Sequence, residues 1–415
     1  MKRRSFILSA LSMLSLISFD LKASYHTLEL DIQDSNLKLL KSRIYNDKME
    51  LKLLLSRLMN KTKKVLKLDK LYYLDESVTL PDGCDIIGTG KNSGFVFVSE
   101  GRSESKYGLV IRNSNNKLEN FGLYFTSSHN ISNDIGKPDF ICIFVTETAS
   151  NCSLNNLFVE NYTPDLFFFS HCVRVMGSNH SINNCSIING SICLSIRGQD
   201  ITVLNNHVTN NFSSRVKGPW RPSCDVWDGI VMEGCKQCSI IGNVIYDCGQ
   251  SGIYCGGNGS ASSNISIIKN TVYKNWNRGI DIGVTGKVTD KNFVKNILIK
   301  ENIVYDNREP QIWLNGVSGS QVSHNIVNIT LNYKKFYRGY YGGVVGIALG
   351  SDSRTENNSV TLNEVNVMPE SVAAITVYGK GNSVRDNNIK GKGVWYDKKS
   401  DVLSHNIVIN NVLTK

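Results

Sequence analysis

The chain has 415 residues, a formal net charge of +10 and only seven prolines. The few prolines leave little room for a proline-rich linker, and no basic helix or known motif favours a nucleic-acid partner. A moderate positive charge instead suits an acidic partner such as an anionic polysaccharide.

The first 24 residues, MKRRSFILSALSMLSLISFDLKAS, combine a basic start, a modest apolar run and small residues at the end. This pattern is typical of an export signal peptide rather than of a membrane anchor. The Arg-Arg pair followed by Ser-Phe-Ile fits a twin-arginine signal, and an ordinary secretory signal is the alternative. No later segment is apolar and long enough to cross a bilayer. We therefore expect a bacterial protein that is periplasmic, secreted or on the cell surface, without stable membrane insertion and with an undefined oligomeric state.

Residues 35–62 carry Leu, Ile and Met at helical spacing among lysines, which predicts an amphipathic helix. The open end of a repetitive body must be covered, so we expect residues 25–63 to form an N-terminal helical cap. A partner-binding helix is the alternative.

Ten units between residues 152 and 408 repeat one pattern: a polar residue, an aliphatic residue at the third position, usually Asn at the sixth, and an aliphatic residue at the eighth. The units are CSLNNLFV, HSINNCSI, ITVLNNHV, CSIIGNVI, ISIIKNTV, ILIKENIV, SQVSHNIV, NSVTLNEV, NSVRDNNI and DVLSHNIV. They recur at irregular spacings of roughly 20 to 38 residues, which is typical of a solenoid with variable loops. We predict that residues 64–415 form one elongated body of stacked rungs.

Alternation along strands predicts two aliphatic columns and one asparagine ladder inside this body. The first column would be Val203, Ile240, Ile267, Ile299, Val322, Val360 and Val384. The second would be Val208, Ile245, Val272, Val304, Val327, Val365, Ile389 and Val408. The ladder would be Asn206, Asn243, Asn270, Asn302, Asn325, Asn363, Asn387 and Asn406. Because stacked buried amides can satisfy backbone groups, we interpret the ladder as structural and not as a ligand site.

Most rungs contain a further strand, for example GIVMEG, GIYCGG, GIDIGV and QIWLNG. Alternation places their aliphatic residues inside. It predicts an outer column formed by Arg174, Ser195, Arg197, Glu233, Tyr254, Asp281, Trp313 and Asn315.

The segment VLKLDKLYYLDESVTLPDGCDIIGTG, residues 65–90, resembles the first rung of pectate-lyase-like β-helix proteins and phage tailspikes. With the Asn-rich repeats, the resemblance to the right-handed parallel β-helix superfamily covers residues 64–410. It implies an all-β, right-handed parallel β-helix solenoid with an N-terminal α-helical cap. Residues 278–317 also resemble the exported β-helix protein of colanic acid biosynthesis.

Eleven cysteines are an odd number, and several occupy repeat positions, so we interpret them mainly as small core residues. A metal site at Cys235-x-x-Cys238 and a bridge between Cys248 and Cys255 are alternatives.

Two rungs are enlarged, and their long segments, residues 211–229 and 332–343, are rich in basic and aromatic residues. Aromatic rings stack on sugars and guanidinium groups pair with carboxylates, so an acidic-glycan groove is predicted. The alternative is a pair of solvated loops. The predicted substrate-binding residues are Arg221, Trp227, Tyr254, Arg278, Trp313, Asn315 and Arg338.

Four acidic residues between these loops, Asp225, Asp228, Glu233 and Asp281, are the predicted catalytic residues. Glycoside hydrolysis needs one protonated and one ionised carboxyl group, and either Asp225 or Asp228 would be the acid. The alternative is β-elimination from a uronic acid, with Arg278, Tyr254, Arg221 or Lys217 available. No cofactor is required, although calcium could bind Asp225, Asp228 and Glu233.

We therefore predict a polysaccharide lyase or glycoside hydrolase that acts on an acidic extracellular or capsular polysaccharide. The chain lacks the motifs of the named pectate lyases, alginate lyases and polygalacturonases. The alternatives are a non-catalytic polysaccharide-binding or surface-polysaccharide assembly protein and a purely structural solenoid.

Overall fold

The computed structural model describes residues 37–99, 107–127, 140–163, 170–215, 227–256, 260–283, 289, 292–330, 344–350, 354–396 and 405–414. The predicted export signal, residues 1–24, lies outside them. Internal contacts divide the chain into two units, Met1–Asn46 and Asp47–Lys415. Of the first unit only the beginning of helix α2 is described, and the second unit contains all the strands.

Helix α2 (Leu37–Met59) confirms the helix that was predicted over residues 35–62. Its part in the second unit packs on the first coil, since Leu51 and Leu58 belong to the same buried cluster as Leu66. Lys48 pairs with Asp75 at 2.8 Å beside this contact. The apolar side of this part of the helix therefore covers one end of the core. Among the described residues, no helix has the length and apolar character needed to cross a membrane.

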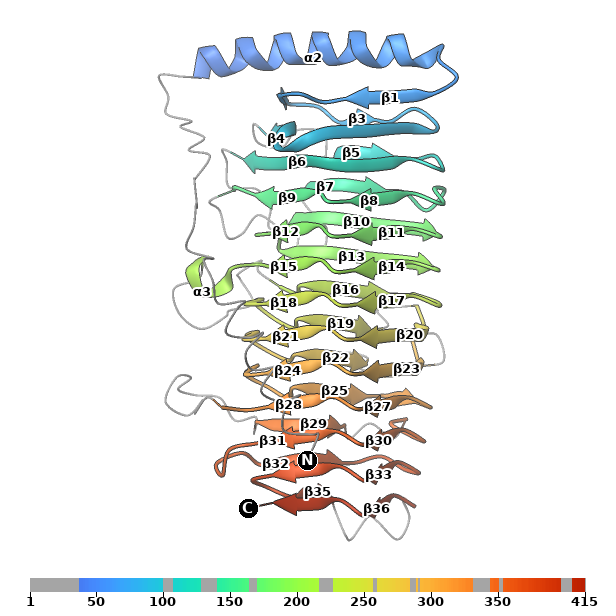
Figure 1. The fold of residues 1–415 in the computed structure, drawn as a ribbon, viewed down its shortest axis with the longest axis vertical. Helices are drawn as coiled ribbons and strands as arrows, with labels where there is room; N and C mark the ends of the chain where they lie inside the picture. The colour runs from blue at the N-terminus through green and yellow to red at the C-terminus, as the bar shows by residue number, and fades with distance from the viewer. Residues whose placement is uncertain are drawn as a thin grey trace, which may run out of the picture. The chain divides into compact units, whose positions relative to one another are not determined.

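Among the described residues all the paired strands run parallel, and successive rungs stack their strands on three faces (Figure 1). Within the described residues, the first face is a 12-stranded sheet. It comprises β3 (Val78–Thr79), β5 (Tyr107–Ile111), β7 (Phe140–Val145), β10 (Ser170–Ser178), β13 (Ile192–Gln199), β16 (Ile230–Glu233), β19 (Ile253–Gly256), β22 (Ile280–Gly283), β25 (Ile312–Asn315), β29 (Val345–Leu349), β32 (Ala373–Val377) and β35 (Val394–Tyr396).

The other two faces are joined by the long strands β4 (Cys84–Ser99) and β6 (Lys117–Ser127). The second face comprises β1 (Lys64–Lys67), β8 (Ser153–Asn155), β11 (Ser181–Asn183), β14 (Thr202–Leu204), β17 (Ser239–Ile241), β20 (Ser263–Ile268), β23 (Val294–Lys300), β26 (Val317–Ser318), β27 (Gln321–Ser323), β30 (Ser359–Thr361), β33 (Ser383–Arg385) and β36 (Ile407–Ile409). The third comprises β2 (Leu71–Leu74), β9 (Phe158–Asn161), β12 (Ser186–Ile188), β15 (His207–Thr209), β18 (Val244–Tyr246), β21 (Thr271–Tyr273), β24 (Ile303–Tyr305), β28 (Ile326–Asn328), β31 (Glu364–Asn366), β34 (Asn388–Lys390) and β37 (Val412–Thr414). A short helix, α3 (Phe212–Arg215), follows β15.

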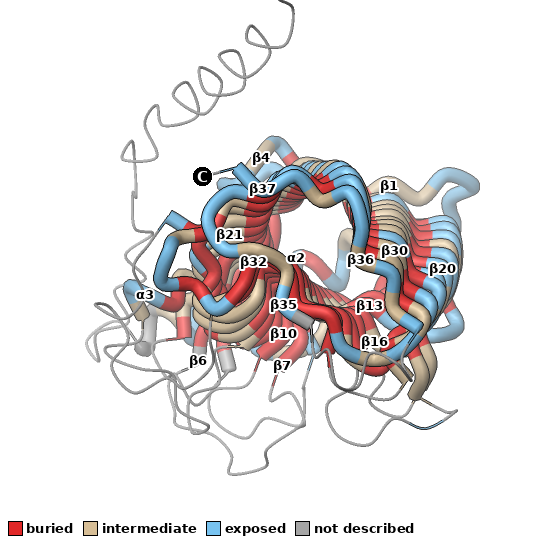
Figure 2. Tube along the Cα trace, turned by 90° about the horizontal axis from the view of Figure 1, so that it is seen from below, coloured by how far each residue is buried: buried red, intermediate tan, exposed pale blue. Residues whose placement is uncertain are grey.

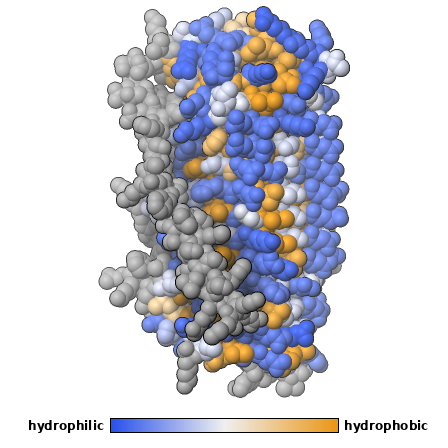
Figure 3. Space-filling model, in the orientation of Figure 1, coloured by the Kyte–Doolittle hydropathy of each residue, from blue (hydrophilic) through white to orange (hydrophobic). Residues whose placement is uncertain are grey.

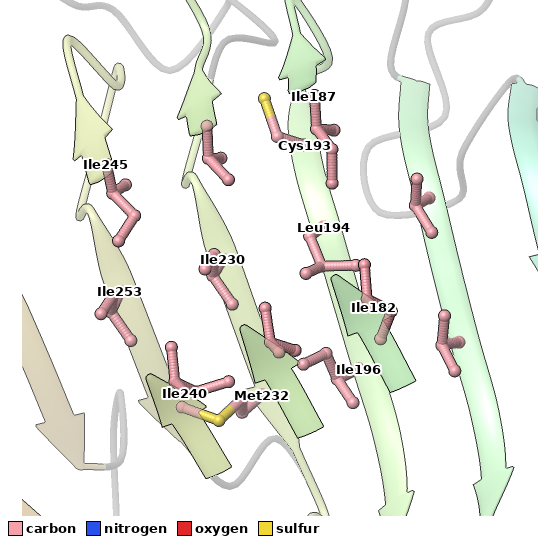
Figure 4. Close-up of a cluster of buried hydrophobic side chains, with 14 of the residues drawn as sticks. Ile182, Ile187, Cys193, Leu194, Ile196, Ile230, Met232, Ile240, Ile245 and Ile253 are labelled. Carbon is pink, nitrogen blue, oxygen red and sulfur yellow. The ribbon is translucent and has the colours of Figure 1, made fainter. Parts of the chain in front are cut away.

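The interior is filled by aliphatic residues that stack from rung to rung (Figure 4). The first predicted column is confirmed, because its residues are direct partners in consecutive parallel pairings from Val203 to Val384. In the view along the coils, the buried residues line the inner side of the tube (Figure 2). On the face that Figure 3 shows, the described side chains are largely hydrophilic, with hydrophobic side chains between them. The period of two along each strand thus separates core from surface, as predicted.

The asparagine ladder is present and buried. Asn302 shows its pattern: the backbone N–H and the Nδ2 of Asn270 both donate to Oδ1 of Asn302, at 2.9 and 3.0 Å. Nδ2 of Asn302 donates in turn to the carbonyl of Ile267 at 2.8 Å and to Oδ1 of Asn325 at 2.9 Å. Each amide therefore links three rungs and satisfies backbone groups that would otherwise be buried without partners.

A left-handed residue precedes each member of the ladder. Examples are Glu301, with a φ of 58°, and Leu362, with a φ of 56°. This residue turns the chain between the second and third faces, and the ladder amide bonds the carbonyl two residues before itself, as Asn363 does to Thr361 at 3.1 Å. The corner therefore combines a locally costly backbone with a hydrogen bond that fixes it.

The prediction for the last repeat is wrong by one strand. Val408 pairs with Val384 and so belongs to the first aliphatic column, while Leu413 continues the second. Asn406 belongs to a separate ladder, in which it accepts from the backbone N–H of Asn382. The main ladder ends instead at Asn411, which accepts from Nδ2 of Asn387 at 2.8 Å.

The cysteines behave as core residues. All ten in the described part of the chain are buried and free, including Cys248 and Cys255. Cys142, Cys172 and Cys193 occupy equivalent positions in adjacent rungs. No three His, Cys, Asp or Glu side chains within the described ranges come together as a metal site.

We expect Asn302→Ala to lower the free energy of unfolding by about 3 kcal/mol, because it leaves buried donors and carbonyls in two neighbouring rungs without partners. Chemical denaturation followed by circular dichroism measures this change. The matched control is Asn388→Ala, at an exposed strand position, for which the expected change is below about 0.5 kcal/mol. Equal effects of the two substitutions would contradict the structural role of the ladder.

Candidate functional site

The outer side of the first face carries the candidate site. Parallel pairing aligns Arg174, Ser195, Val231, Tyr254, Asp281 and Trp313 in consecutive rungs. Five of the predicted outward residues therefore share one row, whereas Arg197, Glu233 and Asn315 stand two positions further along their strands, in a second row. Adjacent rungs are about 4.8 Å apart, so these side chains form a row along the solenoid axis.

Asp228 lies just before β16 and is only 6% exposed. The backbone N–H of Ser251 donates to its Oδ1 at 2.7 Å. Burial raises the pKa of Asp228 to about 7; the hydrogen bond from Ser251 lowers it, and the nearby charges of Asp281 and Glu233 raise it further. Asp228 therefore exchanges its proton near neutral pH, as a general acid must.

Asp281, on β22, belongs to the outer column, yet it is only 4% exposed. Asp281 faces outward, as predicted, but neighbouring polar groups cover it. The hydroxyl of Ser251 donates to its Oδ2 at 3.0 Å, and Nη1 of Arg278 lies 2.9 Å from the same oxygen. Ser251 therefore contacts both buried carboxyl groups, Asp228 through its backbone and Asp281 through its side chain.

Arg278 connects Asp281 to two further residues of the site, Glu309 and Trp313. Its Nε lies 3.2 Å from the Oε2 of Glu309, and its guanidinium lies over the ring of Trp313, 3.6 Å from the centroid. Burial raises the pKa of Glu309, and the charge of Arg278 opposes this shift. The guanidinium is thus shared between Asp281, Glu309 and an aromatic face, which fixes its position.

Aromatic residues border the two carboxyl groups. Trp227 and Tyr254 pack against a small buried cluster formed by Ile192 and Val231. The ring of Tyr254 occupies the space that a Cβ at position 256 would need, so Gly256 is required there. Rings in this position offer flat apolar surfaces beside the carboxyl groups.

The remaining predicted residues divide into two groups. Glu233 ends β16 and raises the pKa of Asp228 through its charge, and Asn315 lies against Gly350 two positions after Trp313. Asp225, Arg221 and Arg338 lie outside the described residues, as does most of each enlarged loop. The calcium alternative, which needs Asp225, therefore has no described set of ligands to support it.

Ser251 and Glu309 were not predicted from the sequence. A signal for Ser251 was present: Asp228, Ser251 and Arg278 each stand two positions before the first isoleucine of their strand, in Asp-Gly-Ile, Ser-Gly-Ile and Arg-Gly-Ile. In-register pairing of these strands aligns the three residues. Glu309 lies in the turn before β25, and no repeat position marks it.

The fold and this group of buried carboxyl groups define a parallel β-helix protein with a polar cluster at one sheet. The chain belongs to the right-handed β-helix family: the family described as "Right handed beta helix region" matches residues 107–294 and 260–414.

Two tail-spike proteins are similar to this chain in sequence. The tail spike protein of Salmonella phage epsilon15 is 28% identical over 365 residues, which are 84% of this chain and 33% of that protein. The crystal structure of the Dettilon tailspike protein is 28% identical, with a TM-score of 0.72, over 85% of this chain and 65% of that chain. This chain therefore spans one third of the first relative and less than two thirds of the second.

A third similarity concerns the fold alone. The A-module of a mannuronan C-5 epimerase from Azotobacter vinelandii shares 14% identity with a TM-score of 0.60, over 88% of this chain and 94% of that module.

The raised pKa of Asp228 makes stability depend on pH. The folded protein keeps a proton up to about pH 7, whereas the unfolded chain releases it near pH 4, so stability falls as the pH rises through this interval. Asp228→Asn does not titrate. We expect its unfolding free energy, relative to wild type, to increase by roughly 4 kcal/mol between pH 4 and pH 7.5. Glu364→Gln, which changes an exposed carboxylate on β31, is the control. A constant difference between Asp228→Asn and wild type would show that the carboxyl group is not protonated when folded.

Proposed function

We propose that this protein hydrolyses an acidic polysaccharide, with Asp228 as the general acid and Asp281 as the general base. The proposal rests mainly on the contact of Ser251 with both carboxyl groups. Asp228 has a pKa of about 7, whereas Asp281 forms an ion pair with Arg278. Two carboxyl groups in such different surroundings are suited to opposite proton-transfer roles.

In the proposed step, Asp228 gives its proton to the glycosidic oxygen as the bond between that oxygen and the anomeric carbon breaks. A water molecule attacks the anomeric carbon from the opposite side and gives a proton to Asp281. The two residues are two rungs apart, about 10 Å along the axis. Their side chains both reach Ser251, which supports the separation of about 6.5 to 9.5 Å that inverting hydrolases use.

The surroundings support a sugar substrate. Tyr254 and Trp313 lie in the same row as Asp281, and their rings can stack on sugar faces. Trp227 lies near Tyr254, beside the same buried cluster. The tail-spike relatives and the mannuronan C-5 epimerase module have the same type of scaffold.

We place this activity outside the cytoplasm. The proposal rests on the signal-like residues 1–24 of the sequence.

Incubation with a panel of acidic bacterial polysaccharides tests the reaction. We expect new reducing ends without the absorbance of unsaturated products. Asp228→Asn and Asp281→Asn are expected to lower kcat by at least 10³-fold, because each removes a proton-transfer group whose contribution is about 10² to 10⁴ and disturbs the other through Ser251. Glu364→Gln, the matched change of an exposed carboxylate, is expected to leave kcat unchanged.

Two other outcomes of the same experiment would contradict hydrolysis and indicate a different function. A rise in absorbance would indicate β-elimination. Binding of a polysaccharide with no cleavage, equal in wild type and Asp228→Asn, would indicate a binding or assembly protein.

The pH dependence gives a separate test. Because Asp228 must be protonated to act as the acid, kcat is expected to fall tenfold for each pH unit above about 7. Initial rates between pH 5 and pH 9 measure this limb of the profile. A rate that rises through pH 7 would instead assign Asp228 the role of a base.

A further inference from the structure

Two arginines lie on the outer side of the first face, on the N-terminal side of the carboxyl groups. Arg174 is on β10, and Arg197 is on β13 one rung later and two residues further along the strand. Both side chains point away from the core, because Val173, Val175 and Ile196 point into it. The next rung along the axis carries Glu233 at the end of β16.

Arg174 is half-buried, and its Nε is buried without a hydrogen-bond partner among the described residues. The nearest described carboxylate is Glu233, which stands beside Arg197 one rung later and favours the charge of Arg174 without a direct ion pair. Nη2 of Arg197 donates a hydrogen bond to the hydroxyl of Ser260 at 3.1 Å. A guanidinium that is partly removed from water and has no anionic partner is unfavourable for the protein alone.

The local electrostatics agree with this geometry. Burial lowers the pKa of Arg174, and the positive charge of Arg197 lowers it further, while Glu233 acts in the opposite direction. The two like charges therefore repel each other across one rung. An anion placed between them would relieve both the repulsion and the lost hydration.

A flat apolar surface adjoins the arginines. The rings of Tyr107 and Phe144 are stacked, with centroids 5.0 Å apart and an interplanar angle of 15°. Phe144 pairs in register with Arg174, so the stack lies one rung before it. Guanidinium groups next to a stacked aromatic pair provide the two contacts that an acidic sugar needs, one for its carboxylate and one for its ring.

We propose that Arg174 and Arg197 form a subsite that binds the carboxylate of an acidic sugar residue in the substrate. This inference rests on the proposed function and extends it. Arg197 is one rung and Arg174 two rungs from Asp228, about 5 to 10 Å along the axis. The polysaccharide therefore lies along the solenoid axis, and the bound carboxylate belongs to a sugar close to the cleaved bond on the N-terminal side of Asp228.

The subsite can be tested without knowing the natural polysaccharide. Sodium glucuronate, galacturonate and N-acetylneuraminate are titrated against the full chain by saturation-transfer difference NMR, with glucose as the neutral comparison. We expect at least one acid to bind in the millimolar range and glucose not to bind. Arg197→Gln and Arg174→Met, which keeps an unbranched stem, are expected to weaken that binding at least fivefold. The control Arg385→Met changes an exposed arginine on β33 and is expected to leave it unchanged.

Thermal stability distinguishes a ligand-binding arginine from a purely structural one. Because the buried Nε of Arg174 has no hydrogen-bond partner among the described residues and its charge lies near that of Arg197, Arg174→Met is expected to raise the midpoint of thermal unfolding in the absence of sugar acids. A lower midpoint, equal sugar-acid binding in wild type and both variants, or no binding by wild type would each overturn the subsite.

Failure of this inference can be distinguished from failure of the proposed function. Asp228→Asn is expected to bind the sugar acids as wild type does while losing cleavage. If cleavage proceeds normally in Arg174→Met and Arg197→Gln with unchanged KM, hydrolysis stands and the subsite is wrong. If the sugar acids bind but no polysaccharide is cleaved, the subsite stands and the hydrolytic proposal is wrong.

Discussion

In-register parallel pairing, locked by the asparagine ladder, is the constraint on which the rest of the structure depends. Each strand must repeat its inward residues at the same height as its neighbours, about 4.8 Å away, and a slip of one residue would turn every aliphatic side chain outward. The ladder prevents such a slip, because each amide bonds both the backbone and the amide of the adjacent rung. The same register then determines what each rung presents to solvent.

The candidate site is a product of that register. Asp228, Ser251 and Arg278 stand two positions before three successive strands of one face. Their equivalent positions bring together a carboxyl group, a hydroxyl group and the guanidinium that pairs with Asp281. Sequence distances of more than twenty residues become single-rung separations. Asp228 itself comes from the end of the first enlarged segment, residues 211–229. From the N-terminal to the C-terminal rungs, the outer side of this face carries the stacked aromatic rings and the arginines, then the carboxyl groups and then Trp313.

Much of this architecture could be predicted from the sequence, because the pattern of aliphatic residues has the same period as the strands. The two aliphatic columns, the ladder and the outer row follow directly from it. The last repeat was misplaced because asparagines occupy two ladders, and the segment that ends in Val408 matches the repeat pattern although its Asn406 lies in the other ladder. The eight-residue pattern alone does not distinguish the two ladders.

The burial and protonation of the site residues were harder to predict from the sequence than the fold. Alternation correctly assigned Asp281 to the outside of the sheet, but the hydroxyl of Ser251 and the guanidinium of Arg278 cover it, so that outward and exposed are different properties. Glu309 could not be found, since it belongs to a turn whose length differs from rung to rung. The pKa of Asp228 depends on burial by neighbouring rungs, and no single repeat contains that information.

The ladder also has a direction. In every bond between two side-chain amides the donor belongs to the earlier rung and the acceptor to the later one, as from Asn243 to Asn270 and from Asn325 to Asn363. The side-chain amide dipoles therefore point the same way and add along the axis, and each amide polarises the next. A body built from nearly identical rungs thus acquires a lengthwise electrical polarity, with its positive end toward the C-terminal rungs.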